Sequence, residues 1–166
     1  MCANEGGLSV ELLCVHHSLA EFSSGDPGID EVARQLHERT RLRDLDDITA
    51  LVVADESGNV AGIASVTDLI LQSDLNAGGT PVEGLFLFYP LLAVDRQFRA
   101  GLVLSMLLDE LERVRERRFS RSKYLGEIAS PLVASGSEAL AELLERRGFL
   151  QLQTDSSVSF RPAAPR

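Results

Sequence analysis

Cysteine is scarce in this sequence, and its scarcity limits both disulfide and metal chemistry. The 166 residues include two cysteines, Cys2 and Cys14, which form neither a disulfide framework nor a pair with metal-ligand spacing. Cys14 falls within an expected strand, where a free cysteine behaves as a small buried hydrophobe. The sequence therefore predicts no metal site and no disulfide.

Two kinds of apolar segment are also missing. The N-terminus has no basic start followed by an apolar core, so no signal peptide is expected. No apolar stretch approaches the length of a membrane span, and no segment repeats at a fixed period. These absences predict a soluble, cytoplasmic protein without a membrane partner.

Positive charge is in short supply as well. Lysine and arginine number 16 against 25 acidic residues, which gives a formal net charge of −9. An acidic surface repels phosphate backbones, so nucleic acid is expected to be an unlikely partner. One local exception gathers near the end of an expected helix: Arg113, Arg115, Arg117, Arg118, Arg121 and Lys123. Cations at a helix C-terminus suit its dipole, and we favour this interpretation over a binding patch.

The apolar content that is present suffices for one compact domain. Hydrophobic residues make up 45% of the chain, which favours a collapsed fold over disorder, and the length fits a single core. We expect a flexible N-terminus over residues 1–7, one domain over residues 8–160 and a disordered tail over residues 161–166.

Local patterns in the first half predict a strand, a helix and a hairpin. Residues 8–15 form a β-rich run. Asp26 then supplies an N-cap and Pro27 a first helical residue. The runs 48–54 and 59–71 flank a short polar turn, which predicts an antiparallel hairpin.

The second half alternates strand and helix. Residues 85–94 are apolar on both faces, which predicts a central strand, and Pro90 within it indicates a bulge or splayed pairing. A helix over residues 99–118 leads to a strand over 124–130, which must run parallel to the strand over 85–94 if the helix crosses over. A helix with a Ser135/Glu138 capping box then ends at Gly148, and two short strands follow. The fold class is mixed α/β with a central βαβ unit.

Two segments of this pattern resemble the GNAT N-acetyltransferase family over most of the chain. LLAVDRQFRAG, before an amphipathic helix, is similar to the family's cofactor motif, and ALAELLERRGF is similar to its late helix ending in Gly-Phe. HHSLAEFSSGDPGIDEVARQL further resembles the opening of acetyltransferases found as toxins in toxin–antitoxin pairs. The resemblance implies a GNAT-like fold with splayed central strands.

The same resemblance implies acetyl transfer from acetyl-coenzyme A to an amine on a small molecule or a protein. The strand end Leu92, Ala93 and Val94 would hydrogen-bond the pantetheine arm. The amides of Arg99, Ala100, Gly101, Leu102, Val103 and Leu104 would hold the pyrophosphate. Because tRNA-acetylating relatives need a basic face, the acidic charge argues against a tRNA acceptor or a toxin role.

Glycines and a tyrosine of the family pattern are absent. Leu102 and Leu104 occupy the two glycine positions of the loop, where a side chain competes with the cofactor for space. Leu144 stands where many relatives carry a proton-donating tyrosine, and it is interpreted as core. These departures leave an alternative open, in which the chain is a catalytically inactive GNAT-like binding module. A donor held in another pose is a third possibility.

Candidate catalytic groups are few. Glu127 lies in an otherwise apolar strand and Glu83 opens the central strand, and both are candidate general bases. Tyr89 is a candidate for lining the cofactor gap. His16 and His17 have no partner acid in register, and adjacent strand residues face opposite ways, so at most one could enter a site. Edge strands and the late hairpin leave room for a homodimer.

Overall fold

The computed structural model describes residues 7–45, 47–73, 82–98, 100–132, 137–152 and 155–163. Within these ranges the strands are β1 (Ser9–Leu12), β2 (Thr49–Ala54), β3 (Val60–Ser73), β4 (Val82–Val94), β5 (Gly126–Leu132), β6 (Leu150–Leu152) and β7 (Asp155–Pro162). The helices are α1 (Pro27–Arg41), α2 (Ala100–Phe119) and α3 (Ser137–Arg146). None of these described helices is long and apolar enough to cross a membrane.

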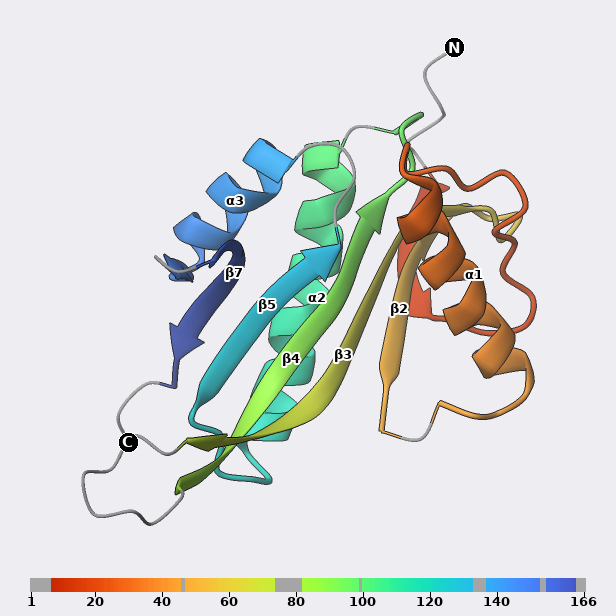
Figure 1. Ribbon diagram of the computed structural model, residues 1–166. Coiled ribbons are helices and arrows are strands. Elements are labelled where there is room, and N and C mark those ends of the chain that lie inside the picture. Colours follow the sequence, from red (N-terminus) through yellow and green to blue (C-terminus); the bar gives the residue numbers. More distant parts are fainter. Residues whose placement is uncertain are drawn as a thin grey trace.

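The described strands form one seven-stranded sheet in the order β1-β2-β3-β4-β5-β7-β6. β4 and β5 run parallel and the remaining neighbours are antiparallel. In Figure 1 the arrowheads of β4 and β5 point toward the same end of the molecule, where α2 begins. This arrangement confirms the predicted mixed sheet with a central βαβ unit.

Helix α1 starts as the sequence predicts. The Asp26 side chain accepts hydrogen bonds from the backbone N–H groups of Gly28 and Ile29, and Pro27 stands in the first turn. The cap satisfies amides that have no partner inside the helix. Ile29, Ala33 and Leu36 face inward and are buried. This apolar stripe holds α1 against the sheet.

The sheet separates two hydrophobic cores, one on each face. The core under α1 includes Val52 and Ile63, which are fully buried. The core under α2 and α3 includes Leu87 and Leu107, which are also fully buried. Figure 1 shows α1 on one face and α2 with α3 on the other. Because strand residues alternate between faces, β4 contributes Leu92 to one core and Ala93 to the other.

The C-terminal part also follows the prediction in outline. Gly148 adopts a positive φ of 86° after α3, the conformation expected of the glycine that ends a helix. The Ser135 of the predicted capping box lies outside the described residues. Strand β7 continues to Pro162, two residues beyond the expected end of the domain, and brings Arg161 into the sheet.

Candidate functional site

The parallel strands β4 and β5 lose their register at two prolines. Tyr89 pairs with Ala129, but the next pair is Leu91 with Leu132. Pro90 lies in this step on β4 and Pro131 on β5, and neither can donate to a ladder. The pairing of β4 with β3 shifts at the same level. The bulge predicted at Pro90 is therefore confirmed.

The last residues of β4 have a partner strand on one side. Leu92, Ala93 and Val94 pair with Ala64, Ile63 and Gly62 of β3. On the other side β5 ends at Leu132, and its described pairing with β4 goes no further than Leu91. A backbone edge without a neighbouring strand retains hydrogen-bonding groups that an extended ligand can use.

The loop between β4 and α2 is fastened to the loop between β1 and α1. Asp95 is 3% exposed, and its Oδ2 accepts a 2.8 Å hydrogen bond from the Ser23 backbone N–H. Its Oδ1 accepts from the Gln97 N–H at 2.8 Å. The Arg96 N–H in turn donates to the Ser23 carbonyl at 2.9 Å. We call this double link the Asp95 latch; it fixes the path of the chain into α2.

The first turn of α2 presents its amides beside this latch. α2 begins at Ala100 and has no acidic residue in its first turn. Unpaired N–H groups and the helix dipole make such an end attractive to anions. Gly62 of β3 leaves room for the close approach, because a Cβ there would lie 2.4 Å from Val103 Cγ1. Arg99, the residue before the helix, lies outside the described residues.

The two leucines of this turn point in different directions. Leu104 is 1% exposed and belongs to the core under α2, whereas Leu102 is 39% exposed. Apart from its chain neighbours and its own helix backbone, no atom of the described residues lies within 4 Å of the Cβ position of Gly101. The Leu104 side chain therefore occupies core volume and does not compete with a ligand outside the loop. Sequence spacing missed this because it does not give the rotation of the helix.

Glu127 lies at the centre of a buried cluster of charges. Its Oε1 accepts hydrogen bonds from Tyr89 Oη at 2.6 Å and Arg161 Nη2 at 2.8 Å. Its Oε2 accepts from Arg115 Nε at 2.8 Å and Arg161 Nε at 2.6 Å. Glu112 also accepts from Arg161, so two carboxylates meet two guanidinium groups. Burial, reinforced by the Glu127 carboxylate, raises the pKa of Tyr89, which keeps the phenol protonated as a donor.

This environment does not suit the predicted role of Glu127 as a general base. The side chain is fully buried, and its four contacts fill the acceptor positions of a carboxylate. An incoming amine could reach it only by displacing a partner. Tyr89, predicted to line the gap, instead turns its hydroxyl to Glu127.

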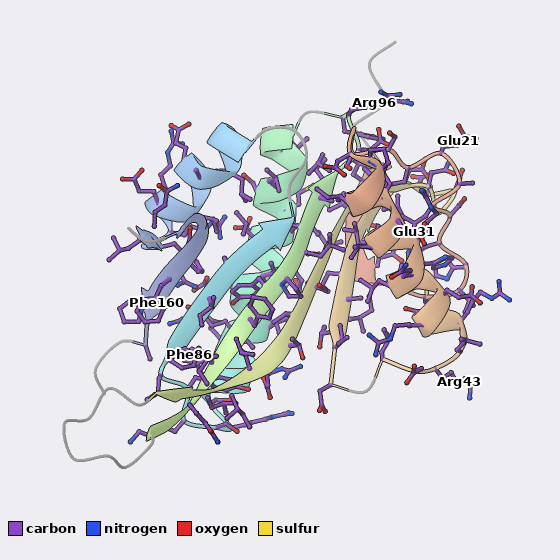
Figure 2. The ribbon with its side chains drawn as sticks, viewed as in Figure 1. Glu21, Glu31, Arg43, Phe86, Arg96 and Phe160 are labelled. Atoms are coloured by element: carbon purple, nitrogen blue, oxygen red, sulfur yellow. The ribbon has the colours of Figure 1, made fainter. Side chains whose placement is uncertain are left out.

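The other candidate base lies at the wrong end of β4. Glu83 pairs through its backbone with Gln72, next to the start of the strand. At about 3.3 Å per residue, its backbone is about 23 Å from Pro90. Figure 2 shows Phe86 and Phe160 together at that end of the sheet and Arg96 at the opposite end. Among the described residues, the end of β4 and the first turn of α2 thus lie at the same end of the sheet, whereas Glu83 lies at the opposite end.

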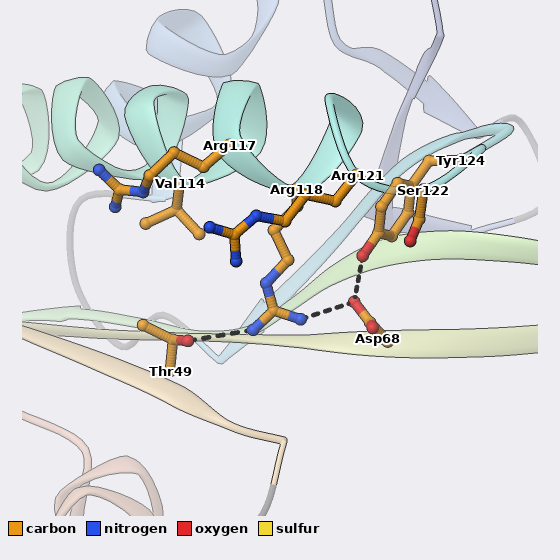
Figure 3. A pocket seen from close by; sticks show the side chains of 8 residues that line it. All are labelled: Thr49, Asp68, Val114, Arg117, Arg118, Arg121, Ser122 and Tyr124. Carbon is orange, nitrogen blue, oxygen red and sulfur yellow. Dashed lines mark hydrogen bonds and ion pairs between the residues drawn. The ribbon is translucent and has the colours of Figure 1, made fainter.

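A basic pocket of about 500 Å³ lies at the far end of α2. Figure 3 shows Arg118 reaching across it to Asp68 and Thr49, with contacts of 2.9 and 3.1 Å. Tyr124 donates to the same Asp68 carboxylate at 2.8 Å. Arg117 and Arg121 line the pocket and are exposed. Arg118 is thus held by internal contacts, Arg117 forms a 3.7 Å ion pair with Glu110, and Arg121 is exposed.

The histidine pair does not behave as the sequence suggested. β1 ends at Leu12, so His16 and His17 lie in a turn and not in a strand. Their ring centroids are 4.2 Å apart, and both rings contact the Cys14 sulfur. Burial lowers the pKa of His17, so the ring is neutral at pH 7. The expectation that these two side chains face opposite ways is therefore wrong.

Comparison with known proteins finds structures of the same fold but no related sequence. No family model matches the chain, and no curated protein matches its sequence. A solved structure of AtaT complexed with acetyl-methionyl-tRNAfMet has a TM-score of 0.69 and 16% identity, over 93% of this chain and 94% of that one. A tyrosine-to-phenylalanine variant of KacT has a TM-score of 0.71 and 18% identity, over 94% and 95%. The chain has the GNAT fold. These matches confirm the predicted fold over most of the chain.

One partner expectation is overturned by the same GNAT-fold structures. They include AtaT with acetyl-methionyl-tRNAfMet and the KacTA–DNA complex, which has a TM-score of 0.68 and 18% identity over 93% of this chain and 92% of that one. Another holds AtaT with the C-terminus of its antitoxin AtaR. The expectation that nucleic acid is unlikely as a partner is therefore wrong. Net charge sums the whole surface and hides local basic regions.

Proposed function

We propose that the protein is an N-acetyltransferase that takes its acetyl group from acetyl-coenzyme A. The observation that carries the proposal is the backbone edge of Leu92–Val94 on the side away from β3, which pairs with no described strand and lies beside the first turn of α2. An extended pantetheine arm needs hydrogen bonds from such an edge, and a pyrophosphate needs amides and a positive dipole end. A structure of the same fold, AtaTR bound with AcCoA, supports the pairing of this fold with this cofactor.

The binding groups follow from the chain itself. The backbone of Leu92, Ala93 and Val94 holds the arm, and the unpaired amides in the first turn of α2, from residue 100 to residue 102, face the phosphates. Backbone amides do not depend on residue type, so Leu102 in the first turn of α2 donates as a glycine would. The Leu104 N–H lies beyond the unpaired amides of the helix start and bonds within the helix. The inward orientation of Leu104 removes the steric objection at that position, whereas the Leu102 side chain is 39% exposed. The Asp95 latch keeps the amides in place before the cofactor arrives.

The transfer requires a neutral amine. Its lone pair attacks the thioester carbonyl carbon, and the carbon–sulfur bond breaks. The amine nitrogen loses a proton to solvent, and the leaving thiolate takes up a proton from solvent. An α-amino group has a pKa of about 8, against about 10.4 for lysine. A site whose predicted carboxylate bases lie elsewhere therefore favours an α-amine over a lysine side chain.

For the acceptor we propose the α-amine of an aminoacyl-tRNA. AtaT, of the same fold, is seen with acetyl-methionyl-tRNAfMet. In this chain Arg117 and Arg121 line a pocket at the opposite end of α2 from the cofactor loop. Over 20 residues α2 is about 30 Å long, so a ligand contacting both ends must be large. A tRNA satisfies that requirement and carries the phosphates that arginines bind.

Two measurements test the proposal. Acetyl-coenzyme A at 100 times its dissociation constant should stabilise the fold by about 2.7 kcal/mol, which thermal unfolding detects. Radiolabelled acetyl groups should then pass to aminoacyl-tRNA and not to a lysine peptide whose N-terminus is blocked. Absence of any stabilisation by millimolar acetyl-coenzyme A in a folded protein would exclude the cofactor.

A GNAT-fold binding module without turnover is the second candidate. Leu144 favours it, because this side chain is 4% exposed in the core and supplies no phenol to the leaving thiolate. Stabilisation by acetyl-coenzyme A without transfer to any amine would support this alternative. Transfer to an α-amine would reject it.

A further inference from the structure

The turn after β1 brings together three side chains that bind transition metals. Cys14 is half-buried, His16 is exposed and His17 is 3% exposed. One ligand atom from each lies within 4.8 Å of the others. The turn is closed by a hydrogen bond from the His17 N–H to the Cys14 carbonyl at 3.1 Å, so the backbone itself holds the three side chains on one side.

The distances match those between ligands of a single ion. Zinc–sulfur bonds of about 2.3 Å and zinc–nitrogen bonds of about 2.0 Å at a tetrahedral angle place the two ligand atoms about 3.5 Å apart. Cys14 Sγ lies 3.3 Å from His17 Nδ1. It lies 2.8 Å from His16 Nδ1 and 3.6 Å from His16 Nε2. Small side-chain rotations are enough to admit an ion among these atoms.

The contacts of His17 indicate which ring nitrogen carries the lone pair that a metal ion needs. Its Nδ1 accepts a 3.0 Å hydrogen bond from the Cys14 N–H, so the ring proton is assigned to Nε2. That buried Nε2 has no hydrogen-bond partner among the described residues, and Glu11 Oε2 is 3.4 Å away. A carboxylate behind a ligating histidine is the usual outer partner of a metal site. Glu11 is placed to take that role.

We propose that Cys14, His16 and His17 bind one Zn²⁺ ion, with Glu11 orienting His17. One thiolate and two imidazoles form a donor set that suits zinc. On binding, the Cys14 thiol releases its proton to solvent and the His17 Nδ1 lone pair moves from the Cys14 amide to the ion. The fourth position faces solvent beside the exposed His16.

The proposal has a structural consequence within this chain. The turn begins the segment from residue 13 to residue 24 that leads to Ser23, the backbone partner of Asp95. An ion at the start of this segment restricts it without touching the cofactor groups. Zinc should therefore raise the thermal unfolding temperature independently of acetyl-coenzyme A, so the site can be tested even if the proposed function fails.

The test titrates Co²⁺ into the full chain after chelator treatment, in a Cys2→Ser background that leaves Cys14 as the single thiol. We expect one equivalent to bind with a thiolate-to-cobalt charge-transfer absorption, and Zn²⁺ to displace it. Cys14→Ser should abolish that absorption. His16→Ala should weaken binding, and Glu11→Gln should weaken it about tenfold or more.

A matched control separates the site from adventitious histidine binding. The chain has three histidines, and His37, on α1, lies outside the turn, so His37→Gln should leave the affinity unchanged. Absence of the charge-transfer absorption, or equal binding by the parent and the His16→Ala variant, would overturn the proposal. Circular dichroism on each variant confirms that it is folded.

Discussion

At the scale of single residues, the buried Glu127 carboxylate has a structural role, because all its described hydrogen bonds come from residues that hold the fold together. Arg115 reaches it from α2, Arg161 from β7 and Tyr89 from β4. The Glu127 carboxylate of β5 thereby joins β4, α2 and β7. Breaking a buried ion pair on one side leaves the other charge uncompensated in a poorly solvated place.

Glu127→Gln should therefore lower the free energy of unfolding by about 3 kcal/mol, measured by urea denaturation. Glu142→Gln is the matched control, because Glu142 forms an exposed pair with Arg146 and such pairs contribute about 0–1 kcal/mol. Under conditions where it is folded, Glu127→Gln should retain acetyl transfer. Lost transfer with unchanged stability would instead restore Glu127 as the base.

At the scale of elements, the start of α2 depends on a hydrogen bond to another loop. The Asp95 carboxylate joins the β4–α2 loop to Ser23, 72 residues earlier in the chain. A second aspartate offers a comparison, because Asp55 Oδ1 accepts from the Ser57 and Asn59 N–H groups within the β2–β3 turn. Both aspartate side chains accept hydrogen bonds from nearby backbone N–H groups, but only Asp95 lies in the loop before α2.

Asp95→Ala should weaken acetyl-coenzyme A binding and cost about 1–3 kcal/mol of stability, the penalty for unpaired buried groups. Asp55→Ala should also lower stability yet leave the dissociation constant unchanged. Isothermal titration calorimetry and urea denaturation measure the two effects. Equal affinity in both variants would show that the latch does not organise the cofactor loop.

At the scale of the whole molecule, charge is unevenly distributed. The net charge of −9 coexists with Arg117, Arg118 and Arg121 around one pocket. Association with a polyanion depends on such local fields and is screened by salt. If tRNA contacts this pocket, the affinity for tRNA should fall as the salt concentration rises.

Arg121→Ala should weaken tRNA binding and reduce the slope of log affinity against log salt by about one unit. Arg34→Ala, on the exposed face of α1, serves as the control and should change neither quantity. Filter binding across a salt series gives both slopes. An unchanged slope for Arg121→Ala would remove the pocket from the tRNA interface.

Local signals explain what the sequence could predict. The Asp26 cap, the Pro90 bulge and the Gly148 end each depend on neighbouring residues, and each was confirmed. Non-local contacts could not be predicted in this way. Glu127 meets Arg161 across 34 residues, and the burial of Leu104 depends on the rotation of α2. The histidine pair was misjudged because β1 ends at Leu12.

The two edge strands also limit how this molecule can associate. Of the described strands, β1 at one border has four residues and β6 at the other has three. Short edge strands offer few unpaired backbone groups to another chain. A second copy or a peptide partner would gain little by extending the sheet, so a stable complex must be built mainly from side-chain surfaces. Mutations that disrupt such a complex should therefore lie on exposed side chains and leave the backbone ladder unchanged.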